Sequence, residues 1–364
     1  MIYEFWYAGL QGVAAQKKIC LRECMKTAEA IYYMEETQLR QFEFLNERER
    51  NRIIQAQKIR DFGSQYQKMT ERGIRFIPYF SEEYPHRLRE IQDPPYALYI
   101  KGSLPDPQSR KAAVIGARRC TPYGEKYGVD FARALAECGV EIISGMARGI
   151  DGMGHRGALL AGGKTYAVLG CGVDVCYPRE HIGLYSDILE QGGGIISELP
   201  PGSAPLARNF PARNRIISGM SDAVLVMEAG KKSGSLITVD MALEQGRDVY
   251  ALPGPVNSAL SDGCNRLIRQ GAGILLSPEE LLEEWGLKEP GGRATGKMKI
   301  KNEKTLESDE KLVYSCLGLY PKSADQLASE TGLGIRKVLD LLISLELQGY
   351  AEEISKNYYV ISRC

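Results

Sequence analysis

The chain has 364 residues, of which 44% are hydrophobic and 25% are charged, as in an ordinary soluble protein with two or three domains. Its 46 basic and 46 acidic side chains cancel, so a surface that binds nucleic acid must be a local patch. The nine scattered cysteines and only three histidines predict reduced thiols and no metal site. The sequence lacks a signal peptide and any apolar run of about 18 residues, so we expect a cytoplasmic protein with no membrane partner.

The first 75 residues place apolar side chains at helical spacing, as in ERNRIIQAQKIRDF, and predict a helical N-terminal domain. Residues 76–110 hold six prolines, five of them before residue 106, which remove backbone donors and fix the chain in extended conformations. This segment therefore predicts a connector with one short strand at residues 96–100.

From residue 111 to about residue 285, short β-branched runs alternate with Gly-rich turns and helical stretches, the pattern of βαβ units. The pattern predicts an α/β domain over residues 76–287, with a mainly parallel sheet covered on both faces. A ligand of such a sheet binds outside the carboxyl ends of the strands. The expected strands are residues 112–116, 140–144, 165–170, 194–197, 223–228, 248–252 and 273–276.

Residues 288–304 are rich in Gly and Lys without apolar periodicity and predict a flexible linker. Residues 305–364 follow with three helical stretches and an alternating segment, which indicate a winged-helix domain. This domain carries 6 basic and 9 acidic side chains, so we expect a protein-interaction or accessory role rather than independent binding of duplex DNA.

The loop after the first predicted parallel strand runs from Gly116 to Gly124. Thr121 fits the N-cap and Pro122 the first position of the next helix, whose positive end would then face an anion. Two arginines, Arg118 and Arg119, favour phosphate as that anion. Because Arg118 stands where a dinucleotide fingerprint needs its second glycine, we expect neither NAD nor FAD.

The next loop, ISGMARGID, allows two interpretations. Gly145 and Gly149 permit backbone turns whose amides face a ligand, and Asp151 could cap the helix. The same residues also fit a tight strand-to-helix turn without a ligand. His155 lies on the following helix, where a hydrogen-bonded core residue is expected rather than a catalytic base.

The segment AGGKT at residues 161–165 resembles part of a Walker A motif. A P-loop leads from a strand into a helix, whereas here a helical stretch comes first and a strand follows, so ATP hydrolysis is not expected. Lys164 at the start of that strand could contact phosphate or be solvated.

Two further loops suggest an anion site. Arg213, Asn214 and Arg215 are expected on the first turn of a helix begun by Pro211, and residues 228–238 form a Gly/Ser loop that opens another helix. Residues 110–220 carry 13 basic and 10 acidic side chains, against 6 and 11 for residues 221–290, which places the basic side in the first half of the sheet. Aromatic side chains beside these loops are candidates either for stacking on bases or for packing, namely Tyr123, Tyr177 and Phe210.

Taken in order, VIGARRCTPYG, ISGMARGID, GGKTYAVLGCGVDVCYP, FPARNRIISGMS and EAGKKSGSLIT resemble the DNA-processing protein A (DprA, or Smf) family. The resemblance implies an extended Rossmann-like fold that binds single-stranded DNA, forms a homodimer and delivers the DNA to RecA, without catalysis, cofactor or metal. Arg118 and Lys164 match the family's DNA-contacting basic residues. The full set of expected DNA-binding residues is Arg118, Arg119, Gly145, Arg148, Gly149, Lys164, Phe210, Arg213, Asn214, Arg215 and Ser235.

The expected function is therefore a recombination mediator that protects incoming DNA and loads RecA in transformation or recombination, with single-strand-binding protein as a further partner. A competing hypothesis is a nucleotide-binding or nucleoside-monophosphate-processing enzyme of the lysine-decarboxylase-like group. Those enzymes need a PGGxGT loop followed by a catalytic Glu, and this chain has KKSGSLIT instead. A transcription regulator is disfavoured because the winged-helix domain is acidic.

Overall fold

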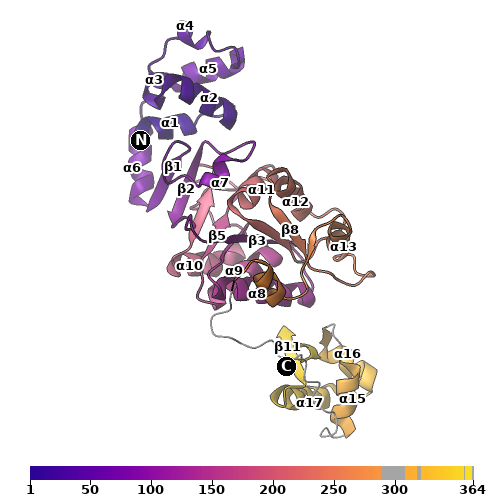
Figure 1. Cartoon of the computed structure of the whole chain (residues 1–364). Coiled ribbons are helices and arrows are strands. Elements are labelled where there is room, and N and C mark those ends of the chain that lie inside the picture. Colours follow the sequence, from indigo (N-terminus) through magenta and orange to yellow (C-terminus); the bar gives the residue numbers. More distant parts are fainter. Residues whose placement is uncertain (288–307, 318–320, 356, 363–364) are drawn as a thin grey trace.

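The computed structural model describes residues 1–287, 308–317, 321–355 and 357–362. Figure 1 shows a helical N-terminal part, a central sheet with helices packed around it, and a small C-terminal part. The mainly parallel α/β architecture predicted from the sequence is confirmed.

Six short helices form the N-terminal part, in agreement with the helical periodicity of its sequence. Helix α5 begins with a capping box, in which Asn46 Oδ1 accepts from the amide of Glu49 and the Glu49 carboxylate accepts from the amide of Asn46. This exchange satisfies two amides that the first turn of the helix leaves free. The helices are α1 Ile2–Ala8, α2 Ala15–Met25, α3 Ala28–Tyr32, α4 Glu36–Leu39, α5 Glu47–Ala56 and α6 Phe62–Glu71.

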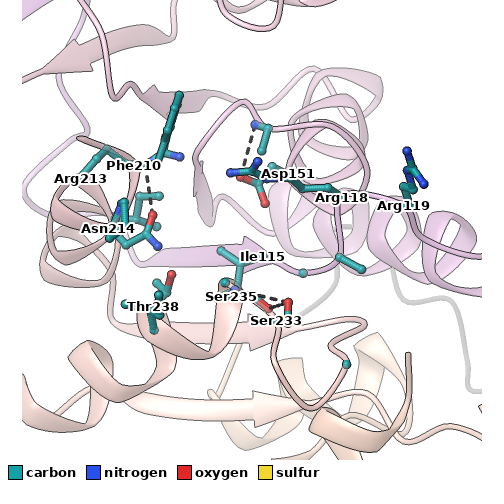
Figure 2. Close-up of a pocket in the computed structure, with 18 of the residues that line it drawn as sticks. Ile115, Arg118, Arg119, Asp151, Phe210, Arg213, Asn214, Ser233, Ser235 and Thr238 are labelled. Carbon is teal, nitrogen blue, oxygen red and sulfur yellow. Dashed lines mark hydrogen bonds between the residues drawn. The ribbon is translucent and has the colours of Figure 1, made fainter. Parts of the chain in front are cut away.

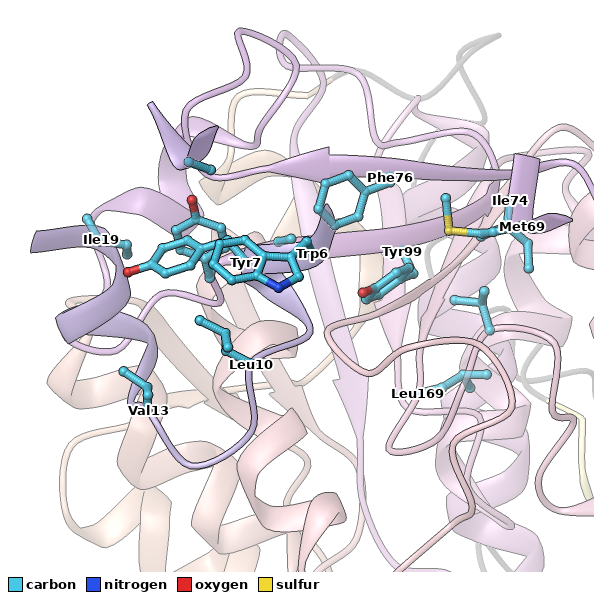
Figure 3. Close-up of a cluster of buried hydrophobic side chains, with 14 of the residues drawn as sticks. Trp6, Tyr7, Leu10, Val13, Ile19, Met69, Ile74, Phe76, Tyr99 and Leu169 are labelled. Carbon is cyan, nitrogen blue, oxygen red and sulfur yellow. The ribbon is translucent and has the colours of Figure 1, made fainter. Parts of the chain in front are cut away.

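The N-terminal helices share a hydrophobic core with the sheet (Figure 3). The ring of Tyr7 in α1 lies 5.0 Å from the ring of Tyr96, edge to face, and both residues belong to the same buried cluster as Tyr99. A polar link reinforces the packing, because the Glu4 carboxylate accepts from Tyr96 Oη at 2.5 Å and from Arg22 Nε at 2.6 Å. The helical part is thus fixed to the sheet by apolar and charged contacts.

The central sheet has nine strands in the order β1-β2-β6-β5-β4-β3-β7-β8-β9. All seven strands predicted after residue 110 are present, and β3 to β7 are buried along their whole length. Continuous apolar runs are expected for parallel strands that are covered on both faces. The strands are β1 Ile74–Pro78, β2 Ala97–Gly102, β3 Lys111–Ile115, β4 Glu141–Ser144, β5 Thr165–Val168, β6 Gly194–Ser197, β7 Ala223–Val226, β8 Asp248–Ala251 and β9 Gly273–Ile274.

The prediction of an extended connector over residues 76–110 was wrong in part. This segment holds most of β1 and all of β2, which pair antiparallel with each other, and β2 pairs antiparallel with β6. The strand expected at residues 96–100 is β2, but β1 was missed. Its terminal Pro78 is tolerated because β1 is an edge strand.

Helices cover both faces of the parallel strands. Buried side chains of α7, α11, α12 and α13 pack on one face, and those of α8, α9 and α14 pack on the other. This arrangement leaves the loops after β3, β5 and β7 at one edge of the sheet, as predicted. The helices are α7 His86–Arg89, α8 Pro122–Glu137, α9 Ile150–Leu160, α10 Ile182–Glu190, α11 Asn209–Met220, α12 Ser235–Glu244, α13 Asp262–Arg269 and α14 Pro278–Glu284, with a 3₁₀ turn η1 at Arg179–His181.

The C-terminal part contains the three helices and the hairpin predicted from its sequence. Its three strands pair in the order β10-β12-β11, and Lys126 Nζ of α8 donates to Glu352 of β11 at 2.6 Å. The predicted linker at residues 288–304 lies outside the described residues. The elements are α15 Ser308–Cys316, β10 Lys322–Ser323, α16 Ala324–Thr331, α17 Ile335–Leu347, β11 Ala351–Ser355 and β12 Tyr358–Ile361.

Within the described ranges, no helix is long and apolar enough to cross a membrane, and no cluster of His, Cys, Asp and Glu could hold a metal ion. The eight described cysteines are free thiols. Burial raises the pKa of Cys264 to about 12 and that of Cys171 to about 11, so both are held as neutral thiols at neutral pH.

Candidate functional site

A pocket of about 840 Å³ lies where the sequence places it, at the carboxyl ends of β3, β5 and β7 (Figure 2). Its walls come from the loops after β3 and β7 and from helix α11, with further residues from the loops after β4 and β5. We call it the loop pocket. Six of the eleven predicted site residues line it, namely Arg118, Arg119, Phe210, Arg213, Asn214 and Ser235.

The other five predicted residues do not line the loop pocket. Lys164 is exposed and directly precedes β5, so it lies at the opposite edge of the sheet and would contact DNA only outside this pocket. Arg148 is exposed and forms an ion pair with Glu180, donating from Nη2 at 2.9 Å. The remaining three, Gly145, Gly149 and Arg215, serve in the packing beneath and beside the pocket.

Three exposed cations form the rim of the loop pocket: Arg118, Arg119 and Lys232. Within the part of the chain that the structure describes, no carboxylate forms an ion pair with any of them. The guanidinium of Arg118 lies over the ring of Phe210, 5.8 Å from its centre. The rim therefore presents cations that no described carboxylate pairs with, and such cations can bind an external anion.

Two aromatic rings stand next to this charge. Tyr177 and Phe210 both line the pocket, with ring centres 5.5 Å apart and planes inclined by 34°. Tyr177 is 43% exposed, so a planar ligand can reach it. Tyr123 has a different environment, because its ring packs 4.7 Å from Tyr127 and its hydroxyl donates to the carbonyl of Pro253.

The floor of the pocket is formed by Asp151 and Arg213, two charged residues that are almost fully buried. Arg213 Nη1 donates to the carbonyl of Gly145 at 2.7 Å and to that of Val168, and burial lowers the pKa of Arg213 to about 10. Burial also raises the pKa of Asp151, whose carboxylate accepts from the amide of Ala147 at 3.4 Å. The floor is a structural network, because its donors and acceptors are directed at the protein itself.

The structure corrects the prediction for the helix that carries Arg213. Helix α11 begins at Asn209, not at Pro211, so Arg213 lies beyond its first turn and points inward. Arg215 is also engaged, since its guanidinium makes two hydrogen bonds of 2.7 Å to the Glu198 carboxylate. Its side chain is only 12% exposed. The first-turn cluster of free cations expected from the sequence is therefore absent from the described helix.

A second correction concerns the start of helix α8. Thr121 caps this helix as predicted, with its Oγ1 accepting from the amide of Gly124. The anion at this position, however, is the protein's own Glu228, which accepts from the Thr121 amide at 2.8 Å and from Thr121 Oγ1 at 2.6 Å. Glu228 is 3% exposed, and burial raises its pKa. It ties the loop after β3 to the end of β7 and thereby positions Arg118.

The glycines of the loop after β4 are required for close packing. Gly149 has φ of 71°, and a Cβ there would lie 2.3 Å from the carbonyl oxygen of Ala117. A Cβ at Gly145 would lie 2.6 Å from both the Arg213 guanidinium and the Asp151 carboxylate. Of the two interpretations left open by the sequence, these distances favour a tight turn over amides that face a ligand. The N-cap of helix α9 is Gly149 rather than Asp151. Asp151 lies in the first turn of the helix, and its carboxylate accepts a hydrogen bond from the amide of Ala147 in the loop.

His155 is a buried core residue, as expected. Its Nδ1 lies 2.7 Å from Thr165 Oγ1, and burial lowers its pKa to about 3. Lys232 lines the pocket but was not among the site residues expected from the sequence, although its position in the Gly/Ser loop of residues 228–238 could have indicated it. Tyr177 was expected only as an aromatic residue beside the loops.

Comparisons with known proteins agree with this geometry. Residues 75–286 match the family described as DNA recombination-mediator protein A, and residues 301–355 match the DprA winged helix domain. Protein Smf of Escherichia coli (strain K12) is 41% identical over 289 residues, which cover 79% of this chain and 77% of that protein. DNA processing protein DprA of Streptococcus pneumoniae is 45% identical over 202 residues, which cover 56% of this chain and 71% of that protein.

Two solved structures are similar in fold and sequence. The X-ray structure of DprA from Streptococcus pneumoniae has a TM-score of 0.69 and 35% identity, and the match covers 78% of this chain and 98% of that chain. The structure of DprA from Helicobacter pylori, which was solved to describe its single-stranded DNA binding mode, has a TM-score of 0.52 and 31% identity. The match covers 58% of this chain and 95% of that chain. From its sequence and its fold, this chain belongs to the DNA recombination-mediator protein A family, whose members include the DprA and Smf proteins.

Proposed function

We propose that the chain binds single-stranded DNA in the loop pocket. One observation carries the proposal: three exposed cations that pair with no carboxylate among the described residues, Arg118, Arg119 and Lys232, line the same pocket as two adjacent rings, Tyr177 and Phe210. Cations hold the phosphate backbone, and aromatic rings stack on bases whatever their identity. The single-stranded DNA binding mode described for the Helicobacter pylori relative supports the same ligand.

Single strands should be preferred over duplex DNA because a base can reach the rings only when it is unpaired. Cations contact phosphates and aromatic rings stack on any base, so little sequence preference is expected. The zero net charge of the chain does not oppose this function, since binding depends on the local rim.

The output we propose is the delivery of the bound strand to a RecA recombinase, with protection of incoming DNA as a consequence of binding. Membership in a family described as recombination mediators supports this role. In this proposal the protein acts in the cytoplasm as a homodimer, meets DNA that is coated with single-strand-binding protein, and performs no chemistry on it. The pocket lining includes one carboxylate, Asp151, and its engagement by a loop amide supports binding rather than catalysis.

The test is a gel retardation experiment that compares single-stranded and double-stranded oligonucleotides of one sequence over a range of salt concentrations. We expect much tighter binding of the single strand, and equal affinity for the duplex would contradict the proposal. In parallel, RecA filament formation on DNA coated with single-strand-binding protein should be faster when the chain is present. DNA binding without any effect on RecA would refute the mediator role, and turnover of nucleoside monophosphates would favour an enzyme.

A further inference from the structure

A second pocket of about 840 Å³ lies between the N-terminal helices and strand β2. We call it the domain pocket. Its apolar side includes the rings of Phe5, Phe62 and Tyr99. Its polar side is formed by the exposed side chains of Gln11, Asn51, Arg52, Gln55 and Gln65.

The polar side of the domain pocket has an unusual chemical composition. It offers four amide side chains and one guanidinium, and no carboxylate lines the pocket. Gln11, Asn51 and Gln65 form no side-chain hydrogen bond with any described residue. An amide side chain both donates and accepts, so it can pair with the polar edge of an unpaired base. The guanidinium of Arg52 uses Nη1 for the carbonyl of Gly12, at 2.7 Å, and can direct other donors outward.

The domain pocket is held open by fixed contacts. The rings of Phe5 and Tyr99 meet edge to face with centres 6.3 Å apart. The indole of Trp6, which also lines the pocket, donates to the carbonyl of Ala56 at 2.9 Å. The hydrogen bond from Tyr96 to Glu4 joins the same helix to the sheet. A ligand would therefore enter a preformed space, at little cost in ordering the protein.

The two pockets are connected by the segment that follows β6. Pro200 lines the domain pocket, whereas Pro205 and Ala207, a few residues later, line the loop pocket. A chain molecule that leaves the loop pocket along residues 200–207 would therefore arrive at the domain pocket. Single-stranded DNA is such a molecule, with a base available at every step.

We propose that the domain pocket receives a base of the same DNA strand that the loop pocket holds. The base contacts the half-buried rings of Phe5 and Phe62, and the amides of Asn51 and Gln65 pair with its edge in a sequence-tolerant way, because each amide can rotate to donate or accept. The inference rests on the proposed function. It assigns to the N-terminal helices the task of extending the binding site along the strand.

Trp6 provides a direct reporter, because the chain contains only two tryptophans and Trp285 can be replaced. In a Trp285→Phe variant, oligothymidylates of about 4 to about 16 nucleotides, the site sizes known for single-strand-binding folds, would be titrated while Trp6 fluorescence is recorded. We expect short oligonucleotides to bind without a change in fluorescence and longer ones to change it and to bind more tightly. Affinity that does not depend on length, with silent Trp6, would overturn the proposal.

A charge-introducing variant makes the test specific. Asn51→Asp combined with Gln65→Glu places two carboxylates at the pocket with almost no change in shape. We expect it to weaken the binding of long oligonucleotides by about fivefold or more, which corresponds to ~1 kcal/mol, because a carboxylate cannot donate to the base edge, and to leave short ones unchanged. The matched control, Gln16→Glu with Gln41→Glu, adds the same charge to exposed positions of the same helical part outside the pocket.

The outcomes separate the two proposals. Equal weakening by the pocket variant and the control would show a general charge effect and would refute a base in the domain pocket. Absence of binding by the wild type at every length would instead refute the proposed function of the loop pocket.

Discussion

The rim and the floor of the loop pocket carry the same kind of residue in opposite environments. On the rim, Arg118 and Arg119 are exposed and have no carboxylate partner among the described residues. In the floor, Arg213 is 4% exposed and donates to backbone carbonyls. An arginine in a Gly-rich loop is therefore not by itself a ligand-binding residue. An arginine whose guanidinium donates to the protein's own carbonyls stabilises the loops, whereas an arginine without such acceptors can bind a ligand.

The largest effect should come from the floor. Arg213→Ala removes a buried cation, and the carbonyls of Gly145 and Val168 lose the hydrogen bonds that it donates. Asp151 then remains as a buried charge without the nearby guanidinium that stabilises it. We expect the free energy of unfolding to fall by about 3–5 kcal/mol, measured by denaturant titration. Arg213→Lys should recover little of it, because an ammonium cannot match the planar guanidinium. A stable Arg213→Ala variant that only loses DNA binding would make Arg213 a rim residue and would invalidate the comparison.

Beside the floor, Arg215→Ala should cost about 1.5–3 kcal/mol, because it breaks two charge-assisted hydrogen bonds to the half-buried Glu198. The double variant with Glu198→Ala should be less destabilised than the sum of the two single variants, which a double-mutant cycle measures. The folded Arg215→Ala protein should keep its affinity for DNA. Additive losses would show that the pair is not coupled.

A third prediction concerns the pH dependence of stability that the buried side chain of His155 contributes. The pKa of His155 is about 3 in the folded protein against 6.5 when unfolded, because burial disfavours the charged ring. As pH falls below 6.5, the unfolded state takes up the proton first, so stability is lost progressively down to about pH 3. At pH 5 the wild type should have lost ~2 kcal/mol relative to pH 8 through this group. A His155→Gln variant should lack this part of the slope, and identical pH profiles for the two proteins would contradict the assignment.

The smallest effect on stability is expected on the rim. Arg118→Ala should leave the melting temperature within about 1 °C of the wild type, since exposed substitutions usually change stability by less than 0.5 kcal/mol. It should weaken binding of all single-stranded sequences alike and flatten the log–log salt dependence by roughly 0.7, because one phosphate is no longer neutralised. Unchanged affinity and slope in the folded variant would move the binding site away from the rim.

Most of the fold could be predicted from the sequence because its signals are local. The seven strands after residue 110 are short apolar runs between Gly-rich turns, and each can be found without knowing its neighbours. Strand β1 was missed because Ile74–Pro78 contains a charged residue and ends in proline, which is acceptable only at a sheet edge. Edge position is a property of the assembled sheet, and the local sequence does not contain it.

The site was less predictable because its distinctions are not local. Glu228 is 107 residues from Thr121, yet it takes the anion position at the start of helix α8. Likewise, Glu198 neutralises Arg215, and the carbonyl of Gly145 engages Arg213. Residue type and spacing predicted which loops form the site. Which cations are free to bind a ligand, however, depends on partners from distant segments, and those partners are known only from the packing.

The proposed DNA binding depends most directly on where an unpaired base lies in the complex. Photo-crosslinking of a single-stranded oligonucleotide that carries 5-bromouracil, followed by mass spectrometry of the crosslinked peptides, would answer this. We predict crosslinks at Tyr177 and Phe210, which Arg118→Ala should weaken at subsaturating protein concentration. Crosslinks confined to Tyr123 or to tyrosines of the C-terminal part, with none at Tyr177 and Phe210, would contradict a binding site in the loop pocket.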